Sequence, residues 1–178
     1  MFKKLLIASA VLAITSNVAL ANGGAPYVGL GTGVIANTAS TTSYRGVPGI
    51  LFVGYGAGMG QGLYLGGEVF GTLGAITAKD NGLKSTYNYG ISFIPGLMIS
   101  DHTMGFARLG LARTHFTPKG NIKSTTASGV QVGLGLQTSL TQNWDLRGEY
   151  TYTASKNISG LGRPSTDAAT GSLVYKFD

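Results

Sequence analysis

Four charged residues stand where their chemistry would matter most, inside runs of small and apolar residues. They are two acids and two arginines: Glu68, Arg108, Arg147 and Glu149. Carboxylates and guanidinium groups pair through bidentate, charge-assisted hydrogen bonds. Such a set could form a gate that switches partners and passes ions, or it could neutralise a polar interior. We favour the second interpretation, because pairing is how protein interiors tolerate charge.

The two histidines, His102 and His115, are the candidates for acid–base catalysis. His115 is followed by Phe116 and Thr117 rather than by a His-x-Ser pattern, and no acid on the same strip would orient the ring. His102 falls in a predicted turn. We therefore expect no enzyme, and a lipid-modifying activity is the least favoured function.

Cofactor chemistry also lacks support in the sequence. The chain has no Cys and no metal-ligand spacing, so no metal site is expected. The glycines at 29, 31 and 33 lie inside a predicted strand rather than in a strand-to-helix turn, so they are not a dinucleotide fingerprint. We expect no cofactor.

The elements that must position these charges are segments of about ten residues with a period of two. One face carries Leu, Val, Ile and aromatic residues, and the other carries Gly, Ser, Gln and charge, including all four residues of the cluster. This period predicts β-strands. The predicted segments are 26–35, 49–58, 63–73, 85–99, 104–117, 128–140, 143–154 and 167–177.

The composition indicates which face points outward. The chain has 29 Gly but only 13 Lys plus Arg and 7 Asp plus Glu, and the polar face is too rich in Gly for a good water-exposed surface. An all-β, single eight-stranded antiparallel up-and-down transmembrane barrel places the apolar face against lipid and the polar face in a narrow lumen. The alternative is a soluble barrel with the apolar face inside.

The connections alternate in length, as in barrels of the bacterial outer membrane. Short turns are expected at 58–62, 100–103 and 141–142, and long outer loops at 36–48, 74–84, 118–127 and 155–166. Aromatic residues at strand ends, among them Tyr27 and Trp144, are expected at the two membrane interfaces. Pro95 lacks a ladder donor inside a strand, so a local bulge is expected there.

The outer rim and loops are predicted to be basic. Only Asp80 and Asp167 oppose eight cations, which are Arg45, Lys79, Lys84, Arg113, Lys119, Lys123, Lys156 and Arg163. A basic ring would suit the phosphates of lipopolysaccharide, whereas ordinary solvated loop charge gives the same pattern, and both interpretations stay open. Nucleic acid is not expected as a partner, because the charges do not form a stripe.

The first 21 residues have the features of a secretory signal peptide. Lys3 and Lys4 precede a largely apolar stretch over 5–18, and Ala19-Leu20-Ala21 fits a small-x-small cleavage site. An uncleaved membrane anchor is the alternative, but the apolar run is short for a membrane span. We expect residues 1–21 to be removed and residues 22–178 to form the barrel.

Several short motifs carry a family resemblance: Tyr27-Val28-Gly29-Leu30-Gly31, Gly54-Tyr55-Gly56, Gly67-Glu68 and Ala107-Arg108-Leu109-Gly110. With these motifs the chain resembles the small outer-membrane β-barrel family that includes the membrane domain of outer-membrane protein A. The resemblance implies a lumenal plug of paired charges. It also implies that the barrel-assembly machinery reads the aromatic residues at the end of the chain, here Tyr175 and Phe177.

The leading functional hypothesis is a non-enzymatic protein of the bacterial outer membrane with a structural and surface-interaction role. Its expected partners are membrane lipid, lipopolysaccharide and a cell-surface or host ligand at the outer loops. The alternative is a narrow gated channel for ions or small solutes.

Overall fold

The computed structural model describes residues 24–39, 42–77, 83–118, 125–156 and 165–177. These residues form nine strand segments, and none of them lies in a helix that could cross a membrane. The segments are β1 (Gly24–Ala39), β2 (Thr42–Gly46), β3 (Gly49–Gly58), β4 (Leu63–Thr77), β5 (Leu83–Ser100), β6 (Thr103–Pro118), β7 (Thr125–Ser139), β8 (Trp144–Ser155) and β9 (Ser165–Lys176).

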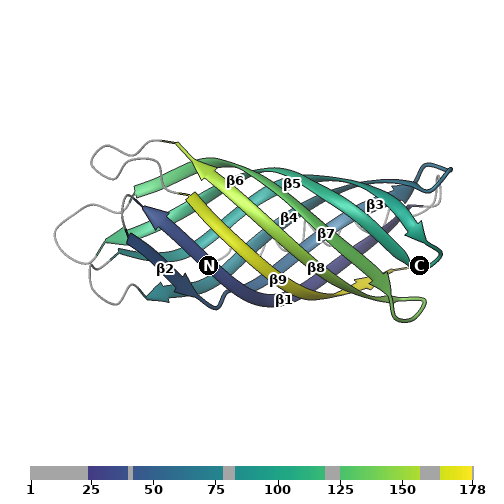
Figure 1. Cartoon of the computed structure of the whole chain (residues 1–178), viewed down its shortest axis with the longest axis horizontal. Helices are drawn as coiled ribbons and strands as arrows, with labels where there is room; N and C mark the ends of the chain where they lie inside the picture. Colours follow the sequence, from purple (N-terminus) through teal and green to yellow (C-terminus); the bar gives the residue numbers. More distant parts are fainter. Residues whose placement is uncertain (1–23, 40–41, 78–82, 119–124, 157–164, 178) are drawn as a thin grey trace, which may run out of the picture.

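The strands form one closed antiparallel barrel, as the sequence predicts. From β3 to β9 each strand pairs with the next one, and β1 pairs with β9 from Tyr27↔Lys176 to Thr38↔Ser165. Figure 1 shows the strands wrapping obliquely around a common axis. Closure leaves the wall without a free edge, which a lipid environment requires because it offers no partners for unpaired backbone groups.

Nine segments make eight barrel strands, because β2 and β3 are two pieces of the second strand. Both pair with β1 in a single register, as the pairs Ile35↔Gly46 and Thr32↔Gly49 show. The interruption falls at Val47 and Pro48, where proline has no N–H to donate to the ladder. The Thr32 hydroxyl donates a hydrogen bond to the Pro48 carbonyl at this break (2.9 Å).

The strands continue beyond the apolar segments at the long-loop end. Most of the predicted loop 36–48 is strand, and β4, β5, β7 and β9 also extend into predicted loops. The cause is that the apolar pattern marks only the length that meets lipid, whereas backbone pairing continues through Ser and Thr, which are compatible with strands. The predicted short turns are confirmed, between β3 and β4, β5 and β6, and β7 and β8.

Two local expectations are wrong. β5 passes Pro95 without a bulge, because the pairs Phe93↔Leu109 and Gly96↔Phe106 with β6 keep one register. The register of β5 with β6 shifts instead near both ends of the strand. Tyr27 does not lie at a membrane interface either: it points into the lumen and is only 3% exposed.

The two faces of the wall separate by parity. Large aliphatic residues cover the outside, for example Leu134, which is 70% exposed, and Leu111, which is 61% exposed. Inward positions hold buried polar groups together with Phe52, Phe70 and other apolar side chains. The apolar face therefore points outward, and the alternative of a soluble barrel with an apolar interior is excluded for the described residues.

Candidate functional site

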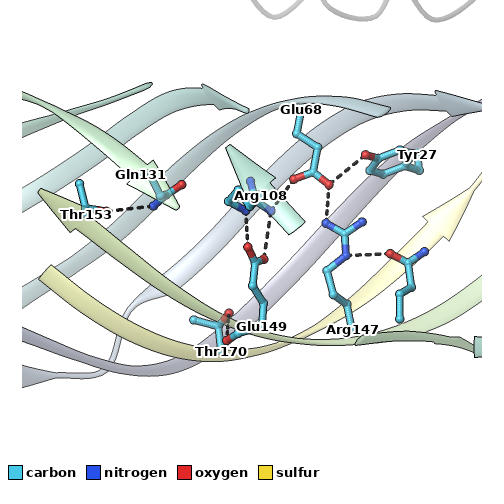
Figure 2. Close-up of polar contacts among 9 residues, drawn as sticks. Tyr27, Glu68, Arg108, Gln131, Arg147, Glu149, Thr153 and Thr170 are labelled. Carbon is cyan, nitrogen blue, oxygen red and sulfur yellow. Dashed lines mark hydrogen bonds and ion pairs between the residues drawn. The ribbon is translucent and has the colours of Figure 1, made fainter. Parts of the chain in front are cut away.

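Glu68 on β4 is the centre of a charge network in the lumen. Its Oε2 accepts a hydrogen bond from Arg108 Nη2 of β6 (2.6 Å), and its Oε1 accepts one from the Tyr27 hydroxyl of β1 (2.9 Å). Arg147 Nη1 of β8 also donates to Glu68 Oε1. Figure 2 shows these donors converging on one carboxylate from three other strands. The Glu68 side chain is fully buried, so these partners must stabilise its negative charge in place of water.

Arg108 continues the network to Glu149 of β8. Its Nε donates to Oε1 and its Nη2 to Oε2 (3.0 Å), which makes the pair bidentate. Gly133 and Gly135 of β7 lie between the two side chains in the register, and their lack of a side chain leaves the space that this contact crosses. The structure thus brings together all four residues that the sequence singled out.

Aromatic rings surround Arg147 in addition to its partner Glu68. Its Nε donates to Gln137 Oε1 (2.8 Å). Its guanidinium carbon lies 4.7 Å from the centre of the Phe52 ring, 5.0 Å from that of Phe106 and 5.6 Å from that of Tyr27. Rings at these distances attract a cation through their quadrupole. Phe52 and Tyr27 share the inward parity of their strands, and this was the sequence signal for their role.

The network extends toward the short-turn end through Asp145, which has the same inward parity and lies nearer the turn. Gln137 Nε2 donates to Asp145 Oδ2 (2.6 Å), and Asp145 Oδ1 lies 2.9 Å from Lys176 Nζ. Positive and negative groups therefore alternate from Lys176 at the end of β9 to Glu149. Lys176 has the same inward parity as Val174. Its ion pair with Asp145 was not predicted, because Lys176 lies near the end of the chain.

Glycines opposite the large inward residues make the packing possible. Tyr27 reaches Glu68 across Gly54, which lies between them in the register. A Cβ at Gly54 would overlap the Tyr27 ring, and one at Gly29 would overlap the Phe52 ring. The abundant glycine on the inward face thus provides the space that the few large lumenal side chains occupy.

The lumen contains a second apolar cluster toward one end and a small cavity toward the other. Toward the short turns, Ile94, Met104 and Phe106 form a buried apolar cluster with Tyr64 packed against it. Toward the long loops lies a cavity of about 50 Å³ that Arg108, Glu149 and several threonines line. This cavity has room for a few waters. Below it, the network and the apolar cluster fill the barrel.

The predicted basic rim is only partly described. Arg45 on β2, Arg113 on β6 and Lys156 after β8 are exposed, and Lys84 lies at the start of β5. Lys79, Lys119, Lys123 and Arg163 lie outside the described residues. Arg113 and Lys156 line the same outer groove, whereas Arg45 lines a different one.

The remaining candidates can also be placed. The His115 ring stacks on Tyr87 (4.9 Å between centres), and its Nδ1 is 3.1 Å from Thr126 Oγ1. No group of three His, Asp or Glu side chains within the described part of the chain could hold a metal ion. At the opposite end, Tyr175 packs edge-on against both Trp144 and Phe177.

The chain matches the family model described as "Outer membrane protein beta-barrel domain" over residues 5–177. It therefore belongs to this family of outer-membrane barrels. No curated protein matches the chain.

Solved structures with the same fold include Neisserial surface protein A (NspA), which is 21% identical with a TM-score of 0.68; the match covers 88% of this chain and 100% of NspA. The attachment invasion locus protein Ail of Yersinia pestis is 15% identical with a TM-score of 0.61, and the match covers 88% and 100% of the two chains. The N-terminal barrel domain of OprF from Pseudomonas aeruginosa is 9% identical with a TM-score of 0.53, covering 88% and 98%. At these identities the likeness shows the fold.

Proposed function

We propose that this protein is a non-enzymatic barrel of the bacterial outer membrane that serves as a structural element and binds anionic partners at its outer end. The observation that carries this proposal is the occupied lumen, in which Glu68, Arg108, Arg147 and Glu149 are paired in salt bridges with one another. Charges that are already paired have little to offer a ligand. The chemistry available to a partner lies at the long-loop end, where Arg45, Arg113 and Lys156 are exposed.

A structure of the similarly folded Ail holds the heparin analogue sucrose octasulfate. That protein is 16% identical to this chain, so the support for a polyanionic partner here is the charge of this chain's own rim. Basic surfaces attract polyanions at long range, and the attraction weakens as salt screens it.

The test is the binding of the purified barrel in lipid vesicles to immobilised lipopolysaccharide and to immobilised heparin. Changing Lys119 and Lys123 to Gln removes two cations between β6 and β7, and we expect weaker binding with a smaller salt dependence. Lys176→Gln, at the other end of the barrel, is the control and should bind as the wild type does. Salt-independent binding, or equal losses for rim and control, would contradict the proposal.

A narrow channel is the second candidate, and the cavity above Glu149 is the observation that favours it. The test is single-channel conductance in planar bilayers. We expect no conductance in the wild type, and none after Glu149→Ala, because the apolar cluster of Ile94, Met104 and Phe106 still fills the lumen. A conducting Glu149→Ala variant would support the channel instead.

The non-enzymatic part of the proposal rests on the surroundings of His115. Its described partners are a tyrosine ring and a threonine hydroxyl, so no carboxylate orients it as a base. We expect the wild type and a His115→Ala variant to release no fatty acid from lipopolysaccharide or phospholipid. A deacylation that disappears in His115→Ala would overturn this part.

We also propose that the barrel-assembly machinery reads Phe177 together with Tyr175. Both rings lie in the aromatic cluster at the end of β9, and Phe177 is 46% exposed. Phe177→Ala should reduce the fraction of folded barrel in the outer membrane. Trp144→Ala, which removes a ring from the same cluster, should reduce it less; an equal reduction would indicate a role in packing rather than in recognition.

A further inference from the structure

A row of polar side chains crosses the outer wall on four neighbouring strands. Tyr89 of β5 pairs with Arg113 of β6, and Arg113 pairs with Ser128 of β7. The Lys156 backbone N–H, just after β8, donates to the Ser128 carbonyl (2.9 Å). Tyr89, Arg113 and Ser128 all have the outward parity of their strands.

An apolar row lies directly beside the polar one. Ile91, Leu111, Val130 and Ala154 occupy consecutive strands and pair in register from β5 to β8. The two rows line one groove of about 870 Å³ on the outside of the barrel, with Tyr152 at its edge. This volume is within the range of small-molecule sites. The groove is therefore amphipathic, polar toward the long loops and apolar toward the middle of the wall.

The two cations of the groove are not paired with any acid that the structure describes. Neither Arg113 nor Lys156 forms a salt bridge among the described residues, and no acidic residue lines the groove. Strands lie about 4.8 Å apart, so the backbones that carry the two cations are about 10 Å apart. Ser128 lies between them in the register and has a small side chain; the space above it, between the two cations, is called the notch below.

The position of these charges restricts the occupant. Arginine and lysine on the lipid face of a barrel are destabilising, and the cost falls from the bilayer midplane to the interface. Arg113 lies only two residues along the strand from Leu111, which is 61% exposed on the same face. An anionic group held by lipid would compensate this cost, and its acyl chain would cover the apolar row.

We propose that this groove binds a phosphorylated glycolipid of the outer leaflet. A phosphate lies in the notch between Arg113 and Lys156, and the hydroxyls of Tyr89, Ser128 and Tyr152 are available to the sugar. An acyl chain lies along the apolar row. This site deepens the proposed function and rests on the outer-membrane placement, but it uses the wall of the barrel rather than the loops between strands.

The test is native mass spectrometry of the full barrel released from detergent micelles with added lipid. The probes are bisphosphorylated lipid A, the same lipid without its phosphates, and phosphatidylglycerol. We expect a one-to-one complex with bisphosphorylated lipid A and much less complex with the other two lipids. Arg113→Ala and Lys156→Ala should each weaken the complex about tenfold, the usual effect of losing a charge-assisted contact. Arg113→Lys should restore part of it.

Lys176→Gln is the control, because Lys176 is a cation at the opposite end of the barrel and does not line this groove. Heat-modifiable migration on gels identifies folded protein in each sample. Three results would overturn the glycolipid site: equal losses with Lys176→Gln, equal binding of dephosphorylated lipid A, or equal binding of phosphatidylglycerol. The site fails alone if these lipids do not bind while the loop lysines still govern binding to heparin. If heparin binding also ignores the loop lysines, the proposed function fails too.

Discussion

The lumen and the outer wall treat charge in opposite ways. Inside, Arg108 and Arg147 are each paired with a carboxylate, and the Glu68 side chain is fully buried among three donors. Outside, Arg113 and Lys156 have no described protein counter-ion, and the few polar groups stand among large exposed aliphatic residues. The comparison shows that the lumenal charges are paired within the protein, whereas the two outer cations depend on their surroundings for a counter-ion.

The largest expected effect comes from breaking the lumenal network at its centre. Glu68→Ala leaves Arg108 and Arg147 buried without their shared carboxylate, so we expect a loss of about 3–5 kcal/mol in the free energy of unfolding. The measurement is a denaturant titration in lipid vesicles. Asp101→Ala, in the exposed turn between β5 and β6, removes the same charge and should cost little.

The partnership itself is tested by a double-mutant cycle. Adding Arg108→Ala to Glu68→Ala should recover part of the loss, because both members of one pair are then absent. Strictly additive effects would show that Glu68 and Arg108 do not depend on each other.

The next effect concerns the lipid face. Leu134→Arg places a charge in the middle of β7, where it should cost about 2–4 kcal/mol if this height is the bilayer midplane. Leu140→Arg makes the same change in the turn after β7, where the cost should fall to about 0–1 kcal/mol. Both leucines are more than half exposed, so burial does not explain the difference. Equal costs in the same titration would refute the placement of the membrane.

Packing inside the barrel can be tested at a glycine. Gly54→Val should force the Tyr27 ring away from Glu68, and overpacking of this kind costs about 1–3 kcal/mol. Gly67→Val is the control on the opposite face, because nothing lies within 4 Å of a Cβ there. The control should be close to neutral or stabilising, since valine suits a strand better than glycine does.

The smallest effects are expected for hydrogen bonds from tyrosine to a carboxylate, one in the lumen and one on the outer face of the wall. Tyr27 donates to Glu68 in the lumen, and Tyr150 donates to Asp167 on the outside (2.6 Å). Tyr27→Phe leaves a buried carboxylate short of a donor and should cost about 1–3 kcal/mol. Tyr150→Phe should cost about 0.6 kcal/mol, the average for hydrogen bonds in membrane proteins. A larger loss of stability for Tyr150→Phe than for Tyr27→Phe would contradict this prediction.

Parity along the strands was sufficient to predict the barrel and the faces of its wall. It placed Glu68 and Arg108 together because charge within a period-two pattern must share one face. It could not predict the aromatic ring of Phe52 over Arg147, because that contact depends on which strands face each other across the lumen. It also missed the outer ends of the strands, since polar residues pair beyond the membrane without an apolar pattern to mark them.

The contact between Glu68 and Arg147 joins residues 79 positions apart in the chain. They lie on β4 and β8, which are not neighbours in the wall, and Tyr27 adds the first strand to the same carboxylate. In a sheet that has not yet closed, β1 and β9 are separate and these charges are still hydrated. We therefore expect their pairing and their removal from water to coincide with the joining of the two ends of the sheet, so that closure is cooperative.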